Sequence, residues 1–210
     1  MNNPVIEVKD LCKTYFMAGG NSQNVLKHIN FSVYSGEFVS IMGHSGSGKS
    51  TLMNILGCLD RPTSGEYFLC GENVASRSDK ELARIRGQRI GFVFQNFNLL
   101  MKRTIIDNVS IPLIYQDVEE EERIERSIKM LEKVGLANYG HRFPNQISGG
   151  MQQRVAIARS LINNPSIIFA DEPTGNLDTR TSDEIMDLFT SLNKQGITIV
   201  LVTHEDDVAD

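Results

Sequence analysis

The spacing of apolar and polar residues changes twice along the chain, which divides it into three parts. In the first part, short apolar or alternating runs end at turn residues such as Gly65. This pattern is typical of strands, which we expect at 6–11, 29–33, 38–42, 67–69 and 90–94. Between the last two, Ser78 followed by Glu81 predicts a capping box at the start of a short helix.

The middle part, about residues 97–162, has helical spacing and no run that predicts a strand. A helix capped by Asp117 is expected here, with apolar positions at Ile124, Ile128 and Leu131. The glutamates that follow Asp117 suit a solvated helix start, because acidic side chains are stabilised near the positive end of a helix. We therefore predict a helical subdomain at about 97–162, inserted in a core that contains a sheet.

Nearly continuous apolar runs return in the last part, as strands at 166–170 and 197–202 with a helix at 181–192 between them. Such runs favour strands covered on both faces, as in a parallel sheet. The fold class is therefore expected to be α/β, with a mostly parallel sheet and an N-terminal antiparallel β region. With 40% hydrophobic residues, the chain of 1–210 should form a single domain.

A glycine-rich loop lies between the run at 38–42 and the next helical pattern. It follows the form G-x-x-x-x-G-K-S and comprises Gly43, His44, Ser45, Gly46, Ser47, Gly48, Lys49, Ser50 and Thr51. Its backbone N–H groups and the positive end of the following helix can converge on a polyphosphate. Lys49 adds a charge for the outer phosphates, and Ser50 adds a hydroxyl for Mg²⁺. The loop predicts a P-loop NTPase that binds a nucleoside triphosphate.

Polar residues follow three of the predicted strands, at the edge where parallel α/β sheets bind ligands. After 166–170, Asp171 is expected to hold Mg²⁺ through its hydration shell, and Glu172 to orient or deprotonate the attacking water. Gln95 follows another strand, where its amide could reach Mg²⁺ or the water. His204 follows the last strand, where it could contact the γ-phosphate.

A second anion site is predicted at Ser148, Gly149 and Gly150. Ser148 is a typical N-cap, and the two glycines expose N–H groups at the start of a helix. A helix so far along the middle part is not expected to reach a nucleotide in the loop of the same chain. A second copy of the chain could present it.

These motifs together resemble the nucleotide-binding domain of an ABC transporter along nearly the whole chain. The resemblance makes residues 43–51 the Walker A loop, Gln95 the Q-loop and residues 147–151 the signature. The signature departs from the usual Leu-Ser-Gly-Gly-Gln at Ile147 and Met151. The resemblance implies ATP and Mg²⁺ as ligands, an ATP-dependent homodimer, and a permease in the membrane as partner.

The resemblance also assigns roles to single residues. Asp171 and Glu172 match Walker B and the catalytic glutamate, and His204 matches the switch histidine. Asp178 belongs to the D-loop at 175–178, and Tyr15 stands where the family places an aromatic that stacks on adenine. Phe16 could replace Tyr15 in that role. The resemblance implies catalytic roles for Glu172, His204 and Gln95. The presence of Glu172 and His204 disfavours a module that only binds nucleotide, because a degenerate site would be expected to lose one of them.

Two segments, 55–65 and 90–100, are most similar to the macrolide-export and lipoprotein-release (MacB/LolD-like) group. The resemblance therefore implies ATP-driven dimerisation and hydrolysis that power a separate permease, for export or for mechanical work on the periplasmic side. An FtsE-like ATPase that regulates cell division through a membrane partner is the alternative.

Charge and hydropathy limit the remaining classes of function. The net charge is −5, and Lys and Arg are scattered, which disfavours nucleic acid as a partner. No apolar run approaches the ~18–20 residues of a membrane helix. Residues 1–4 lack the features of a signal peptide. We therefore expect a cytoplasmic chain, held at the inner face of the cell membrane through its permease.

Overall fold

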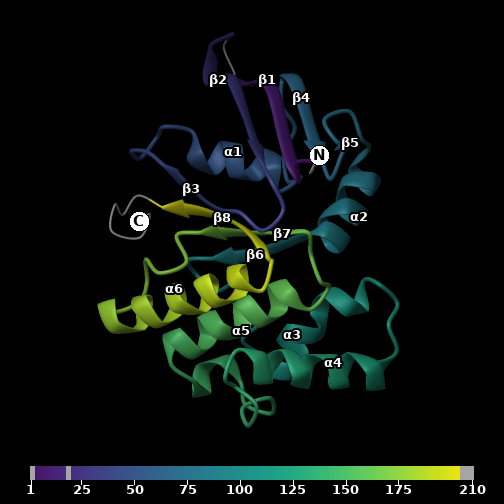
Figure 1. The fold of residues 1–210 in the computed structure, drawn as a ribbon, viewed down its shortest axis with the longest axis vertical. Coiled ribbons are helices and arrows are strands. Elements are labelled where there is room, and N and C mark those ends of the chain that lie inside the picture. Colours follow the sequence, from purple (N-terminus) through teal and green to yellow (C-terminus); the bar gives the residue numbers. More distant parts are fainter. Residues whose placement is uncertain (1–2, 18–19, 204–210) are drawn as a thin grey trace.

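The computed structural model describes residues 3–17 and 20–203, whose strands form two sheets (Figure 1). The antiparallel sheet has the order β2-β1-β4-β5 and consists of β1 (Ile6–Phe16), β2 (Ser22–Val33), β4 (Ser64–Leu69) and β5 (Glu72–Asn73). The parallel sheet has the order β3-β8-β7-β6 and consists of β3 (Phe38–Met42), β6 (Ile90–Phe94), β7 (Ile167–Asp171) and β8 (Thr198–Thr203). The predicted fold class is confirmed.

The helices pack on opposite faces of the parallel sheet. The helices are α1 (Lys49–Leu56), α2 (Asp79–Arg89), α3 (Ile105–Ile114), α4 (Glu120–Lys133), α5 (Gly149–Leu161) and α6 (Thr179–Lys194), with a 3₁₀ turn at Pro144–Gln146. Helix α1 lies between the two sheets, whereas α3, α4, α5 and α6 lie on the far side of the parallel sheet (Figure 1). The phosphate loop is thus placed where the two sheets approach each other.

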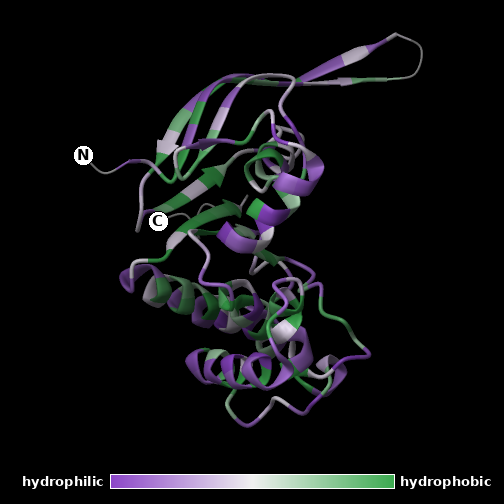
Figure 2. Ribbon diagram, turned by 90° about the vertical axis from the view of Figure 1, so that its right-hand side faces the viewer, coloured by the Kyte–Doolittle hydropathy of each residue, from purple (hydrophilic) through white to green (hydrophobic). Residues whose placement is uncertain are grey.

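Alternate residues of the parallel strands supply the two halves of the core. On β7, Phe169 packs in the cluster that contains α1 and the antiparallel sheet, whereas Ile168 and Ala170 pack in the cluster of α3 to α6. All three are fully buried. The strands of the parallel sheet are accordingly mostly apolar, while the long β1–β2 hairpin carries more polar residues (Figure 2). The apolar run of β7 is therefore covered on both faces, as predicted.

The middle of the chain departs from the sequence prediction at one helix start. Helix α4 has Glu119 at its N-cap, without a side-chain cap, so the predicted cap by Asp117 is wrong. Asp117 instead adopts a left-handed φ of 54° in the turn after α3, a conformation that Asp tolerates better than most residues. Leu131 is buried, but Ile124 and Ile128 are each 42% exposed.

Other local predictions agree with the structure. Ser78 and Glu81 form the predicted capping box at the start of α2. Strands β3 and β6 have the predicted limits, whereas β2 begins at Ser22 instead of residue 29. The extra length of β2 begins with the polar residues 22–24 and pairs with the end of β1, for example Gln23 with Tyr15, and it continues through Val25 and the buried Leu26. Backbone pairing at 22–24 and apolar burial at Leu26 together extend this hairpin.

Candidate functional site

The phosphate loop is shaped by a glycine that no other residue could replace without strain. Gly48 is the N-cap of α1 and has a φ of 97°. A Cβ atom at Gly48 would lie 3.0 Å from Leu26 Cδ2 and 3.1 Å from Val25 Cγ1. The loop therefore turns into α1 while packed closely against β2.

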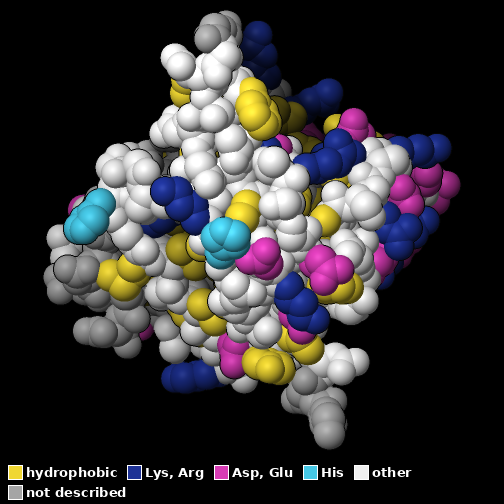
Figure 3. All heavy atoms as spheres, turned by 90° about the horizontal axis from the view of Figure 1, so that it is seen from above, with side chains coloured by type: hydrophobic (Ala, Val, Ile, Leu, Met, Phe, Trp, Pro, Cys, Tyr) yellow, Lys and Arg dark blue, Asp and Glu magenta, His cyan; other side chains and the backbone are white. Residues whose placement is uncertain are grey.

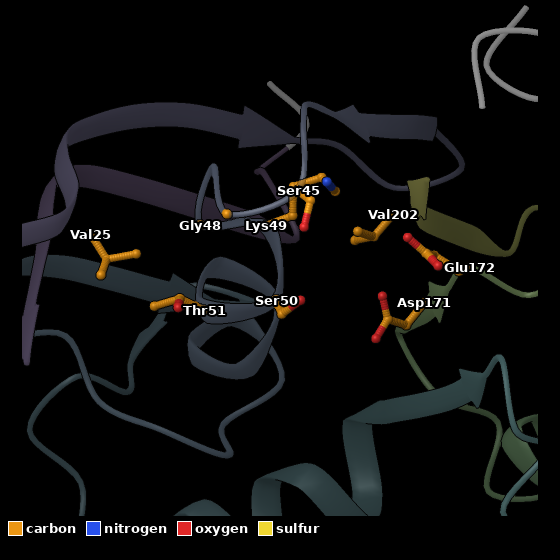
Figure 4. Close-up of a pocket in the computed structure, with 10 residues that line it drawn as sticks. Val25, Ser45, Gly48, Lys49, Ser50, Thr51, Asp171, Glu172 and Val202 are labelled. Atoms are coloured by element: carbon orange, nitrogen blue, oxygen red, sulfur yellow. The ribbon is translucent and has the colours of Figure 1, made fainter. Parts of the chain in front are cut away.

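A cavity of about 440 Å³ lies against this loop. It is lined by Val25, Ser45, Gly46, Gly48, Lys49, Ser50, Thr51, Asp171, Glu172 and Val202. Ser50 at the start of α1 faces Asp171 across the cavity, and Glu172 lies beside Asp171 (Figure 4). Residues that are more than 100 positions apart in the sequence are thus brought to one site.

Lys49 is held within the loop by the loop's own carbonyl groups. Its Nζ atom donates to Gly43 O at 2.5 Å and to His44 O at 3.1 Å. An ammonium group has three N–H donors, so these contacts leave one for a phosphate oxygen. The contacts fix the charge of Lys49 at the loop, where the positive end of α1 also lies.

Two neighbouring carboxylates stand at the end of β7. Burial and the charge of Glu172 raise the pKa of Asp171, and the charge of Lys49 partly opposes them. Glu172 has a left-handed φ of 44°, and its N–H donates to Val202 O at 2.8 Å. This turn directs two acidic groups to one cavity, where a bound cation would relieve their repulsion.

The donors around the cavity fit Mg²⁺ that arrives with a nucleotide. Mg²⁺ prefers oxygen ligands and is commonly held by one or two carboxylates together with substrate phosphates. The hydroxyl of Ser50 and the carboxylate of Asp171 face each other across the cavity (Figure 4). These two residues would hold the ion, while the phosphate loop would hold the phosphates.

Gln95 lies next to the loop after β7 rather than among the residues that line the cavity. Its Nε2 atom is 3.5 Å from Asn176 Oδ1, and Asn176 Nδ2 donates to Gln95 O at 3.1 Å. A Cβ atom at Gly175 would lie 2.6 Å from Gln95 Nε2. The structure therefore brings Gln95 together with the segment 175–178, the two segments that the resemblance assigns to the Q-loop and the D-loop.

The start of α5 is a second helix N-terminus preceded by a cap. Ser148 Oγ accepts a hydrogen bond from Met151 N at 3.3 Å, which confirms the predicted cap. A Cβ atom at Gly150 would lie 2.3 Å from Thr181 Cγ2 on α6, so the absence of a side chain permits this close packing. Of the described residues that line the phosphate-loop cavity, none comes from Ser148, Gly149 or Gly150.

Two of the remaining sequence candidates, Asp178 and Tyr15, are not among the described residues that line the cavity. Asp178 is the N-cap of α6, where its carboxylate accepts from Thr181 N at 3.1 Å and from Thr181 Oγ1 at 2.7 Å. Tyr15 lies near the end of β1 and is 37% exposed. His204 lies outside the described residues.

Gln153 on α5 is a residue whose structural position the sequence analysis missed. It is fully buried, and its Nε2 atom donates to Pro173 O at 2.5 Å and to Phe94 O at 3.4 Å. These carbonyls stand directly after Glu172 and directly before Gln95. A polar residue on the same helical face as Ile157 was the signal that could have revealed it.

The fold and the cavity define a P-loop ATPase cassette. Comparison with known sequences shows further that the chain belongs to the ABC transporter family, whose profile matches residues 26–175. The chain is 55% identical to the uncharacterized ABC transporter ATP-binding protein YknY of Bacillus subtilis, over 98% of this chain and 89% of that protein. It is 52% identical to the macrolide export ATP-binding/permease protein MacB of Bdellovibrio bacteriovorus, over 97% of this chain but 31% of that protein.

Solved structures agree with this assignment. The chain is similar to the ATP-binding cassette MJ0796 in a dimeric post-hydrolysis state bound to ADP and Pi, with a TM-score of 0.86 and 48% identity. The match covers 97% of this chain and 90% of MJ0796. The chain is therefore an ATP-binding ABC ATPase. Among its described helices, none has the length and apolar character that crossing a membrane requires.

Proposed function

We propose that two copies of this chain close on ATP, hydrolyse it and thereby power a separate membrane permease of the export type. The name of the MacB relative joins an ATP-binding and a permease function in one protein, and this chain matches 31% of that length. The YknY relative, by contrast, is named as an ATP-binding protein alone and is matched over 89% of its own length, which supports a cassette whose permease is a separate chain. Binding to that permease would hold the cassette at the inner face of the membrane.

In this proposal the phosphate loop and the end of β7 have different roles in ATP hydrolysis. Lys49 and the loop N–H groups bind the outer phosphates, and Glu172 orients or deprotonates the attacking water. Mg²⁺, held by Ser50 and Asp171, would neutralise the charge on the phosphate oxygens. Gln95 would enter this chemistry only if it exchanged its contact with Asn176 for one with the ligand.

The position of Ser148 is the observation that best supports the proposed dimer. The start of α5 offers N–H donors for an anion, yet it does not contribute to the described lining of its own cavity. Pairing two chains head to tail would let each α5 start complete the phosphate site of the other, a closed two-fold arrangement. Asp178 would lie near the same interface, because α6 packs against the start of α5.

The test uses Glu172→Gln, which keeps the shape of the side chain and removes the base. We expect hydrolysis to fall by about 10²–10⁴-fold, and the ATP-bound dimer to persist. Light scattering should show a dimer with ATP and Mg²⁺, and a monomer with ADP or without nucleotide.

Glu132→Gln is the matched control, because it makes the same chemical change at an exposed position of α4. This variant should behave as the wild type in both assays. A Glu172→Gln protein that stays monomeric in saturating ATP would contradict the shared site. Purification of the wild type from membranes would then identify the partner and separate an export permease from an FtsE-like cell-division partner.

A further inference from the structure

The end of β1 is fastened to the loop that follows α1. Lys13 Nζ lies 2.8 Å from Asp60 Oδ1 and donates to Arg61 O at 2.7 Å. The hydroxyl of Tyr15 donates to Asp60 Oδ2 at 3.0 Å. The Lys13 side chain is only 12% exposed, so solvent screens this ion pair less than a surface pair. One carboxylate thus holds two side chains of β1.

These contacts fix the ring of Tyr15 from two directions. The Lys13 ammonium lies 4.8 Å from the centroid of the ring, while the hydroxyl is bound to Asp60. More than a third of the Tyr15 surface stays accessible. Phe16, which could stack on a base equally well by chemistry, is 79% exposed and has no polar atom through which it could be anchored.

The location of Tyr15 relative to the phosphate loop makes this anchoring relevant to a nucleotide. Val25 of β2 lines the cavity, and its neighbour Asn24 pairs with Thr14 of β1. The helix that begins at the phosphate loop, α1, leads at its other end to Asp60. One helix therefore connects the phosphate site to the residue that holds Tyr15.

We propose that Asp60, together with Lys13, is a positioning residue that fixes the Tyr15 ring as the surface on which the base of the nucleotide stacks. This inference rests on the proposed function, in which the phosphate loop holds the triphosphate. A side chain that is ordered before binding loses less conformational entropy when the ligand arrives. Asp60 thus adds to affinity without touching the nucleotide.

The ionisation of Asp60 agrees with this role. Burial by itself would raise the pKa of this carboxyl group, but hydrogen bonds from Lys13, the Arg61 N–H and Tyr15 hold it below its usual value. The carboxylate is therefore charged at neutral pH.

Ion pairs also form elsewhere on the surface. Basic and acidic side chains lie interspersed on the face of the molecule seen in Figure 3, and Asp79 forms an ion pair with Arg61 at 2.7 Å.

The experiment compares two ligands, ATP and inorganic tripolyphosphate, which lacks the base. Calorimetric titration should show that Asp60→Ala weakens ATP binding about 3–10-fold and leaves tripolyphosphate binding unchanged. Asp60→Asn should restore part of the loss, because an amide still accepts from the Tyr15 hydroxyl but does not attract Lys13. In steady-state assays, Asp60→Ala should raise KM and retain kcat.

Tyr15→Phe and Asp79→Asn complete the series. Tyr15→Phe keeps the ring and removes the hydroxyl that anchors it. Its loss of ATP affinity should therefore resemble that of Asp60→Ala, and the double variant should bind ATP only a little more weakly than either single variant. Asp79→Asn is the matched control, because this carboxylate is 92% exposed and pairs with Arg61 instead of Lys13. It should bind both ligands as the wild type does.

Each other outcome has a distinct meaning. If Asp60→Ala weakens the binding of ATP and of tripolyphosphate equally, or weakens the binding of neither ligand, Asp60 does not position the base. The inference is then wrong. If Tyr15→Ala lowers the preference for ATP but Asp60→Ala does not, only the anchoring role fails. If Tyr15→Ala itself leaves that preference unchanged, the stacking role of Tyr15 fails, and the anchoring role fails with it.

Discussion

Two helix N-termini of this chain follow glycine-rich turns, and their surroundings differ in one decisive respect. The start of α1 carries Lys49 and Ser50 and faces the carboxylates at the end of β7. The start of α5 offers a capped turn without acidic residues, packed against the segment that leads into α6. The first has the donors for phosphate and for a cation, whereas the second has donors for an anion alone.

The comparison shows why a repeated local motif does not make a repeated site. Both helix ends attract anions through exposed N–H groups and the helix dipole. Only α1 adds an oxygen donor and lies opposite Asp171, so only there do we expect the metal and the triphosphate to bind together. The α5 start would gain its ligand from a partner, and the predictions below test this division of roles.

Of the substitutions that test this division of roles, Ser148→Arg is expected to have the largest effect. The long cationic side chain would fill the space that the partner's γ-phosphate needs, so turnover should fall by about 10²–10³-fold or more. ATP binding to a single chain should stay normal, because the start of α5 does not belong to the described lining of the phosphate-loop cavity. Phosphate release and ATP titration measure the two properties separately.

Two substitutions control for side effects of this change. Ser148→Ala removes the cap, which costs about 0.5–2 kcal/mol of stability, but leaves the space open. Met151→Gln restores the usual signature residue and should alter turnover only modestly, since the Met151 N–H already donates to Ser148 Oγ. Weakened ATP binding by monomeric Ser148→Arg would mean that α5 reaches the nucleotide of its own chain.

Lys49→Ala should have the next largest effect, on the other side of the comparison. Charged hydrogen bonds contribute about 1.5–3 kcal/mol, so ATP affinity should fall about 10–100-fold. Lys80→Ala removes the same charge from an exposed position of α2 and should bind ATP normally. Retention of wild-type affinity by Lys49→Ala in a direct titration would disprove its role as the phosphate-binding cation.

The α1 side of this comparison could be predicted well from the sequence, because its signals are local. The run 38–42, the glycine-rich loop and the helix after it are consecutive, and β3 has the predicted limits. Asp171 could be placed at the same edge because parallel strands end together. Here the connection between sequence and site follows from the topology of the sheet alone.

Contacts between distant elements could not be predicted in this way. Asp60 lies in an ordinary turn in the sequence, and only the folded hairpin brings Tyr15 and Lys13 to it. The contact of Gln95 with Asn176 depends on how two loops pack. Asp117, in contrast, was predicted from a local signal and the prediction was wrong. Its side chain suits an N-cap, but the turn after α3 places the residue in a left-handed conformation.

The smallest expected effect is on the thermal stability of the nucleotide-free protein, which the negative charge of Asp171 beside Glu172 should lower. Burial and Glu172 raise the pKa of Asp171, so the folded protein binds this proton more tightly than the unfolded chain does. Stability is therefore lost as the pH rises from the ordinary aspartate pKa to the raised one, and the full cost is present above it. Asp171→Asn removes the charge and should raise the thermal midpoint of the nucleotide-free protein at pH 8.

That gain should shrink as the pH falls towards about 4, where the ordinary aspartate itself becomes protonated. ATP with Mg²⁺ should reverse the order, because the charged wild-type carboxylate attracts the ion more strongly than the neutral amide does and is stabilised by it. Asp178→Asn is the control: hydrogen bonds from Thr181 lower the pKa of Asp178, so the same substitution should not raise the midpoint there. If Asp171→Asn is the less stable protein at pH 8 without ligand, the two carboxylates are already compensated within the fold, and the α1 site does not depend on a cation for its balance of charge.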